Sequence, residues 1–235
     1  MTGILAIETA TDACSVAVLI DEQIRECHQV APRQHSQLLF AMLRELLPRG
    51  SLREQGIGVI AYGSGPGSFT GLRIAASAVQ GLAYSCGLPA IAVPTLAVLA
   101  QTALRQGVAS PEDTVFCTLD ARINEVYSAV YRYEDSLAVL CDGPWACSPG
   151  DLPSNGSASL LALGSGCQFA DQFPLPLGER VWACHPDLLP SARDILPQAA
   201  ASLRRGDTLT PAEVQPVYVR DEISWKKLAE QGKRS

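Results

Sequence analysis

The segment AYGSGPGSFTGLR, residues 61–73, decides the fold, because glycines at positions 63, 65, 67 and 71 lead directly into a long and almost uncharged helix. That helix is predicted from Phe69 to Cys86, with Ser68 as its N-cap and Arg73 as its only acidic or basic side chain. The apolar run at residues 56–61 predicts a buried strand before it. The segment is therefore a strand, a glycine-rich turn and a helix.

Two interpretations of this turn are open. Glycines let backbone N–H groups approach an anion, and a helix N-terminus favours negative charge, so the turn could hold a phosphate or a nucleotide. A P-loop, however, requires a lysine, and the sequence has none before Tyr218, while Thr70 stands where a dinucleotide fingerprint has its third glycine. A structural or partner-contacting turn is the favoured interpretation.

Composition limits the class of protein. The 235 residues are 47% hydrophobic, enough to bury a sizeable core in one large domain or in two of about 100 residues each. The start, MTGILAIETATD, lacks the basic region of a signal peptide, and no run is apolar enough to span a bilayer, so we expect a cytoplasmic protein without membrane contact. The net charge of −6, with a basic segment only from Trp225 to Arg234, argues against strong direct binding of RNA.

The cysteines and histidines form no metal motif. Eight cysteines are irregularly spaced without a C-x-x-C pair, and the three histidines lack the spacing of a helical metal pair. We expect free thiols in a reducing compartment and no metal site.

The order of predicted elements indicates an α/β fold. Strands are predicted at residues 4–8, 14–20, 24–29, 56–62 and 90–93, and helices at 35–47, 69–86 and 95–106. A three-stranded meander followed by βα crossovers forms a mixed sheet with helices on its faces, which is the ribonuclease H-like arrangement.

The same pattern restarts near residue 110. Strands are predicted at residues 115–120, 125–133 and 137–141, then a stretch rich in Pro, Gly and Ser, then a helix at 189–204. We therefore predict the actin-like ATPase fold with two related lobes: residues 1–108 form an N-terminal lobe that carries the partner-binding helices, and residues 109–235 form a reduced lobe of the same plan.

The helices at residues 35–47 and 69–86 are apolar on more than one side, whereas a helix packed on one sheet needs a single apolar stripe. A thick intramolecular core and a protein interface both explain this pattern. On the second interpretation, the candidate interface residues are His35, Leu38, Leu39, Met42, Gly67, Phe69, Leu72, Arg73, Ala76, Val79 and Gln80.

Three segments carry a resemblance to a known family: IETATDACSVAVL at residues 7–19, RQHSQLL at 33–39 and GSGPGSFTGLRIAASAVQGLA at 63–83. Through them the chain closely resembles the bacterial TsaB (YeaZ) family. The match continues, more weakly, through LDARINEVYSAVY at residues 119–131 and PVYVRDEISWKK at 216–227.

The resemblance implies a non-catalytic scaffold or activator. Such proteins help to install the threonylcarbamoyl group on the adenosine beside the anticodon of tRNAs that read codons beginning with A. The chemistry is assigned to a paralogue, TsaD, which binds metal and nucleotide, while TsaC makes the threonylcarbamoyl-adenylate and TsaE is an accessory ATPase. The implied partners are a TsaD-like paralogue, a TsaE-like ATPase and, when alone, a second copy of the chain, with tRNA contacted only indirectly.

The resemblance also implies a lapsed nucleotide site. The first strand turn of an actin-like phosphate site has the pattern D-x-G-T, but this chain has Glu8 followed by Thr, Ala and Thr, without the glycine. Asp120 stands where the second phosphate turn would fall, and Gly164 and Gly166 are candidates for the remains of an adenosine turn. We expect no cofactor in the isolated chain, with ATP or ADP bound only in a complex.

The alternative is an enzyme, either an ATP-dependent small-molecule kinase of the same superfamily or a peptidase-like enzyme. A kinase needs Mg²⁺ carboxylates and a phosphate cradle, which the sequence has only in fragments. A peptidase needs metal ligands or an activated nucleophile, and neither is visible in the sequence. We therefore expect no catalysis by the chain itself.

Overall fold

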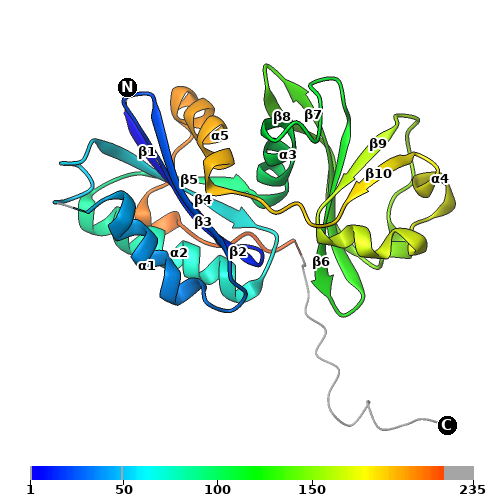
Figure 1. The fold of residues 1–235 in the computed structure, drawn as a ribbon, viewed down its shortest axis with the longest axis horizontal. Helices are drawn as coiled ribbons and strands as arrows, with labels where there is room; N and C mark the ends of the chain where they lie inside the picture. Colours follow the sequence, from blue (N-terminus) through cyan, green and yellow to red (C-terminus); the bar gives the residue numbers. More distant parts are fainter. Residues whose placement is uncertain (1, 49, 220–235) are drawn as a thin grey trace, which may run out of the picture.

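A computed structural model describes residues 2–48 and 50–219. The chain forms two five-stranded mixed sheets side by side, each covered by helices on both faces (Figure 1). Both sheets have one topology: the first strand of each lies at the centre, pairs antiparallel with the second and parallel with the fourth. This confirms the α/β actin-like fold with two related lobes.

The first sheet has the strand order β3-β2-β1-β4-β5. Its strands are β1 (Gly3–Glu8), β2 (Ala13–Ile20), β3 (Gln23–Val30), β4 (Ile57–Gly65) and β5 (Ala90–Pro94). Helices α1 (His35–Leu46) and α2 (Phe69–Cys86) cover one face of this sheet, and α2 has the predicted limits. Ser68 caps α2 as predicted, because its side chain accepts a hydrogen bond from Gly71 N at 3.3 Å.

The second sheet has the order β10-β9-β6-β7-β8. Its strands are β6 (Val115–Arg122), β7 (Glu125–Glu134), β8 (Leu137–Cys147), β9 (Leu160–Leu163) and β10 (Val181–His185). Short helices η1 (Pro149–Asp151), η2 (Ser165–Gln172) and α4 (Leu175–Gly178) lie on one side, and η3 (Pro211–Glu213) follows near the end of the described chain. The sequence did not indicate β9 and β10, which complete the second copy of the topology.

Two helices pack on the sheet that the other half of the chain builds. Helix α3 (Thr95–Arg105) follows β5, yet most of its apolar side chains join the core of the second sheet, whereas those of α5 (Ala192–Arg205) join the core of the first. The boundary predicted between residues 108 and 109 separates the strands of the two sheets along the chain. It does not assign α3 and α5 to the sheets on which they pack. The division into lobes at that residue stays a prediction.

A buried ion pair joins these two helices. Arg105 donates to both carboxylate oxygens of Asp194, from Nε at 2.6 Å and from Nη2 at 2.8 Å, and Thr102 Oγ1 donates to the same carboxylate at 2.7 Å. The Asp194 side chain is 2% exposed, so its charge depends on these donors for solvation.

Within residues 2–48 and 50–219, no helix is both long enough and apolar enough to cross a bilayer.

We predict that Asp194→Ala lowers the free energy of unfolding by about 2 to 4 kcal/mol, because it leaves the Arg105 guanidinium half-buried without its carboxylate. The matched control is Asp207→Ala, which breaks the exposed pair of Asp207 with Arg205 and should cost less than about 1 kcal/mol. Urea denaturation followed by circular dichroism measures both. Equal losses in the two variants would contradict the structural role of the buried pair.

Candidate functional site

The glycine-rich turn between β4 and α2 packs directly against the turn that follows β1. A Cβ at Gly67 would lie 2.5 Å from Ala10 O, and one at Gly71 would lie 1.9 Å from Thr9 O. Real Cβ atoms do not approach backbone oxygens so closely, so only glycine fits at either position. The glycines thus let two segments of backbone come into contact.

Hydrogen bonds hold the two turns together. Ser68 N donates to Ala10 O at 2.7 Å, and Thr9 Oγ1 donates to Gly71 O at 2.8 Å. At the start of α2, Gly71 N donates to the Ser68 side chain. Two of the amide groups at this helix N-terminus, those of Ser68 and Gly71, are therefore engaged by the chain itself.

The turn does not fit a phosphate as these residues are arranged. An anion site needs free N–H groups around an open backbone, whereas here the first strand turn fills the space beside Gly67 and Gly71. The carboxylate of Glu8 fills the space beside Gly63, where a Cβ would lie 2.0 Å from Glu8 Oε2. Of the two interpretations of the glycine-rich turn, the structural one agrees with this geometry.

Glu8 is a buried carboxylic acid at the end of β1. Its Oε1 accepts a hydrogen bond from Ala10 N at 2.7 Å, while Oε2 is buried without a partner among the described residues. Burial raises the pKa of Glu8 from 4.5 to about 7, and the backbone amides of Ala10 and Thr9 offset part of that increase. Burial therefore favours the neutral acid form of Glu8.

The second predicted turn is also occupied by the chain. Asp120 Oδ1 accepts from Arg122 N at 2.7 Å, and Oδ2 lies 3.3 Å from the Arg122 guanidinium. Cβ atoms at Gly164 and Gly166 would lie 2.6 Å from Thr118 O and 2.1 Å from Thr118 Oγ1. These glycines allow the start of η2 to pack against β6, so they do not form an open adenosine cradle.

Sequence reasoning missed one component of the site, a strap formed by residues 214–218. Val217 N donates to Ser64 O at 2.8 Å, and Tyr62 Oη donates to Gln215 O at 2.9 Å. The strap thereby lies across the glycine-rich turn. No spacing or motif connects residues so distant in the chain, so the sequence carried no signal for this contact.

The strap ends in an aromatic cluster on α2. The ring centroids of Tyr218 and Phe69 are 5.8 Å apart, and the Arg73 guanidinium lies 3.7 Å from the centroid of the Phe69 ring. Arg73 Nε also donates to Tyr218 Oη at 3.1 Å. The predicted basic tail from Trp225 to Arg234 lies outside the described residues.

The structure divides the eleven candidate interface residues into two groups. Those in the intramolecular core are His35, Leu39, Met42, Leu72, Ala76 and Val79, and those with exposed or half-buried side chains or backbone are Leu38, Gly67, Phe69, Arg73 and Gln80. His35 is buried because Nε2 donates to the carbonyl oxygens of Thr11 and Ala13, at 2.8 and 3.2 Å. The buried group packs in the core of the isolated chain, and its assignment to an interface stays a prediction.

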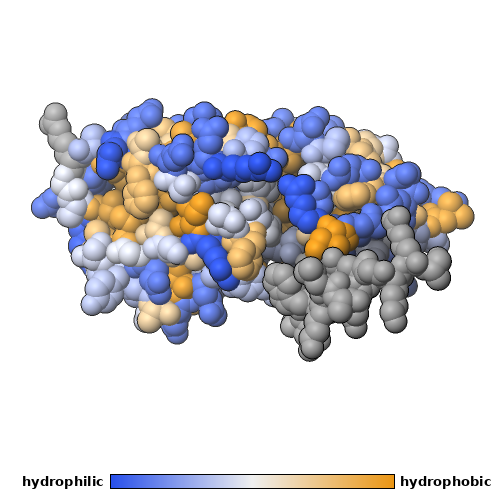
Figure 2. All heavy atoms as spheres, turned by 90° about the horizontal axis from the view of Figure 1, so that it is seen from below, coloured by the Kyte–Doolittle hydropathy of each residue, from blue (hydrophilic) through white to orange (hydrophobic). Residues whose placement is uncertain are grey.

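The outer surface of these two helices, which we call the α1–α2 face, combines three of the exposed candidates with further exposed residues. On α2 they are Phe69, Thr70, Arg73, Ser77, Gln80, Gly81 and Tyr84, and on α1 they are Ser36, Gln37, Phe40, Ala41 and Arg44. Phe40, Phe69 and Tyr84 are 50%, 51% and 81% exposed. Seen from below, this half of the molecule carries hydrophobic surface among hydrophilic side chains (Figure 2).

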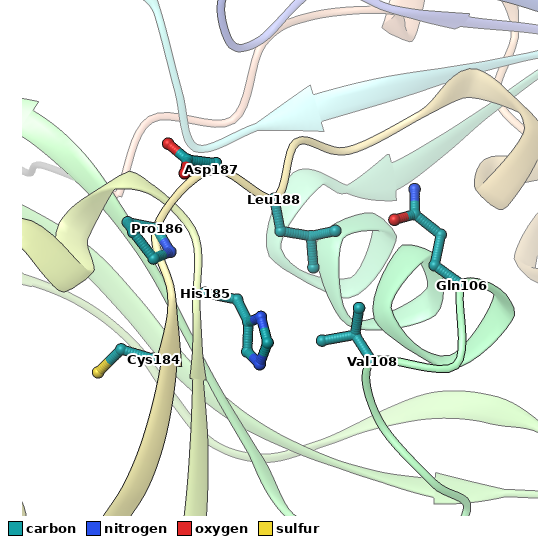
Figure 3. A pocket seen from close by; sticks show the side chains of 7 residues that line it. All are labelled: Gln106, Val108, Cys184, His185, Pro186, Asp187 and Leu188. Atoms are coloured by element: carbon teal, nitrogen blue, oxygen red, sulfur yellow. The ribbon is translucent and has the colours of Figure 1, made fainter.

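Two shallow hollows are present on the described surface. One, of about 390 Å³, lies on α2 beside Phe69, Arg73 and Ser77. The other, of about 420 Å³, lies between the end of α3 and the segment after β10, with the His185 side chain directed toward Val108 and Leu188 (Figure 3). Only the first belongs to the α1–α2 face.

Comparison with known proteins decides the family. The Escherichia coli (strain K12) protein described as tRNA threonylcarbamoyladenosine biosynthesis protein TsaB is 36% identical over 232 residues, which cover 96% of this chain and 97% of that protein. The chain belongs to the TsaB family. A Haemophilus influenzae TsaB is 32% identical over 234 residues, 96% of each chain.

A solved TsaB-family structure and a family model agree with this assignment. The structure described as YeaZ from Pseudomonas aeruginosa is 35% identical, has a TM-score of 0.83, and covers 93% of this chain and 100% of its own. The family model described as TsaD, tRNA N6-adenosine threonylcarbamoyltransferase, matches residues 27–153. These findings confirm the TsaB resemblance seen in the glycine-rich segment.

We predict that Gly71→Ala lowers the free energy of unfolding by about 2 kcal/mol or more, because the new Cβ collides with the carbonyl of Thr9. Gly81→Ala is the matched control in the same helix. Nothing lies within 4 Å of a Cβ at Gly81, so this change should stabilise the helix by about 0.5 to 1 kcal/mol. Urea denaturation distinguishes them, and equal tolerance of both alanines would contradict the close packing of the two turns.

A second prediction concerns pH. Because the pKa of Glu8 is raised in the folded state, folded molecules bind more protons than unfolded ones between pH 4.5 and 7, so the contribution of Glu8 to stability is lost as pH rises through this range. Relative to wild type, Glu8→Gln should therefore gain up to about 3 kcal/mol between pH 4.5 and 7. Chemical denaturation of both proteins at several pH values measures the difference, and a difference independent of pH would contradict the raised pKa.

Proposed function

We propose that this chain is a non-catalytic scaffold or activator in the formation of threonylcarbamoyladenosine in tRNA, and that it acts through a TsaD-like catalytic paralogue. The relatives described as TsaB are named for the biosynthesis of this nucleoside. The matching family model describes a threonylcarbamoyltransferase, which supports a common origin of this chain and such a catalytic subunit.

One observation supports the non-catalytic part of the proposal. The first strand turn, where an actin-like protein would hold a phosphate, packs against Gly67 and Gly71, and the candidate adenosine turn packs through Gly164 and Gly166 against Thr118. The carboxylates at these turns are likewise engaged, Glu8 by Ala10 N and Asp120 by Arg122. On this proposal, nucleotide binds only where a partner completes the site.

The α1–α2 face supports the scaffold part. Its aromatic side chains, Phe40, Phe69 and Tyr84, are the kind that interfaces use, and burying each beneath a partner would contribute about 1.5 to 3 kcal/mol before association costs. Gly81 leaves a gap among them that lets another helix approach closely. A TsaD-like paralogue, or a second copy when that is absent, is the proposed occupant, and a TsaE-like ATPase is proposed to join the complex.

Gly81→Arg tests the face without touching the core. The new side chain enters open space, so the free energy of unfolding should stay within about 1 kcal/mol of wild type. Affinity for the TsaD-like paralogue should fall at least about 100-fold. Gly81→Ala controls for the helix, and Leu175→Arg on exposed α4 controls for added charge; both should bind normally. Titration calorimetry measures the affinities, and normal binding by Gly81→Arg would contradict this face as the docking surface.

Calorimetry with ATP and Mg²⁺ on the isolated chain separates this proposal from a kinase. The closed turns lead us to expect no stoichiometric binding. Tight ATP binding by wild type that is lost in Asp120→Asn would instead favour the kinase.

A further inference from the structure

The thiols of Cys167 and Cys184 meet on one face of the second sheet. Cys184 is in β10 and pairs in register with Ala162 of β9. After β9 the chain turns at Gly164, whose N–H donates to His185 O at 2.9 Å, and Cys167 N then donates to Gly164 O at 3.0 Å. This turn brings η2 back over the end of β10.

The two side chains lie on the same face of the sheet. Cys184 is in register with Ala162, which packs in the core beneath η2 together with Cys167, and the two thiols are close enough to interact electrostatically. The Cys184 side chain points away from the hollow beside His185, toward the other side of β10 (Figure 3). Cys184 is exposed to solvent, whereas Cys167 is 7% exposed and packs with the core beneath η2.

This pair has the arrangement of an attacking thiol and a resolving thiol. An exposed cysteine is open to a reagent in solution, and a second thiol close by can complete a disulfide. Disulfide formation requires the sulfurs to approach to about 2.0 Å. Phe169 interrupts the helical geometry of η2, with φ −103° and ψ 16°, so this irregular segment can accommodate the shift.

We propose that Cys167 and Cys184 form a thiol–disulfide modification site for a low-molecular-weight disulfide of the glutathione type. The inference is independent of the function proposed above. The resulting cross-link would tie η2 to β10 and close a loop that contains α4.

The reaction balances in two exchange steps. The Cys184 thiolate attacks one sulfur of the oxidised reagent, breaks its S–S bond and releases one small thiolate, which leaves a mixed disulfide on Cys184. Cys167 Sγ then attacks Cys184 Sγ and releases the second small thiolate. The two protons lost by the protein thiols are taken up by the released thiolates, and two electrons pass from the protein to the reagent.

The environment of Cys167 sets the order and the pH dependence of these steps. Burial raises the pKa of Cys167 to about 12, and the neighbouring Cys184 adds to the increase. The thiolate fraction of Cys167 is therefore small at neutral pH and grows about tenfold per pH unit, so the second step should accelerate by about 100-fold between pH 7 and 9.

The experiment treats the purified full chain with oxidised glutathione, blocks remaining thiols with iodoacetamide and maps tryptic peptides by mass spectrometry. Trypsin cleaves after Arg180, between the two cysteines, so a Cys167–Cys184 bond joins two peptides. Wild type should release two glutathione thiols per cross-link. Cys167→Ser should retain one glutathione on Cys184, and Cys184→Ser should leave Cys167 unmodified.

Cys141→Ser is the matched control, because Cys141 is another exposed thiol in the same tryptic peptide as Cys167; its removal should leave the cross-link intact. A stable mixed disulfide on wild-type Cys184 at every pH, or a cross-link from Cys184 to a cysteine other than Cys167, would overturn the proposal. The proposal would also be overturned if Cys167 and Cys184 both stayed unmodified while Cys141 reacted fully with oxidised glutathione.

Discussion

The contact between the glycine-rich turn and the first strand turn is the constraint on which the rest of the structure depends. At Gly67 and Gly71 the two backbones lie so close that no side chain fits between them. This contact fixes where α2 begins and which side of α2 lies on the sheet. It also places the carbonyl groups of Thr9 and Ala10 directly beside the glycine-rich turn. On the proposed non-catalytic role, the same packing that positions the helix also closes the candidate phosphate site.

On the proposed scaffold role, the outer surface of the first lobe is the functional part of the molecule. The strap that ends at Tyr218 reinforces this surface, because it lies across the turn and stacks on Phe69 beside Arg73. Helices α3 and α5 are exchanged between the two sheets and joined through Arg105 and Asp194. These two helices and their ion pair thus connect the two lobes.

The sequence predicted the first lobe well because its signals are local. The limits of α2 follow from Ser68 and an uninterrupted apolar run. Strand β9 is only four residues long, and β10 is an exposed edge strand of five residues. These two strands are too short to give a clear sequence pattern. Strand β8 continues past the predicted end through Pro144, which an edge strand tolerates. Periodicity could not separate inward from outward residues on helices that are apolar on several sides, and Leu39 and Val79 proved to be core. The glycine contacts and the strap join residues far apart in the chain, beyond the reach of any local pattern.

The most direct measurement is threonylcarbamoylation of tRNA in a reconstituted system that contains the TsaD-like paralogue and its other components. Two forms of this chain are compared with wild type. The double variant Glu8→Gln with Asp120→Asn removes both candidate nucleotide-site carboxylates, and Gly81→Arg obstructs the α1–α2 face. A scaffold role predicts near wild-type turnover with the double variant and loss of turnover with Gly81→Arg. Loss of turnover with the folded double variant, together with full activity of Gly81→Arg, would contradict the account.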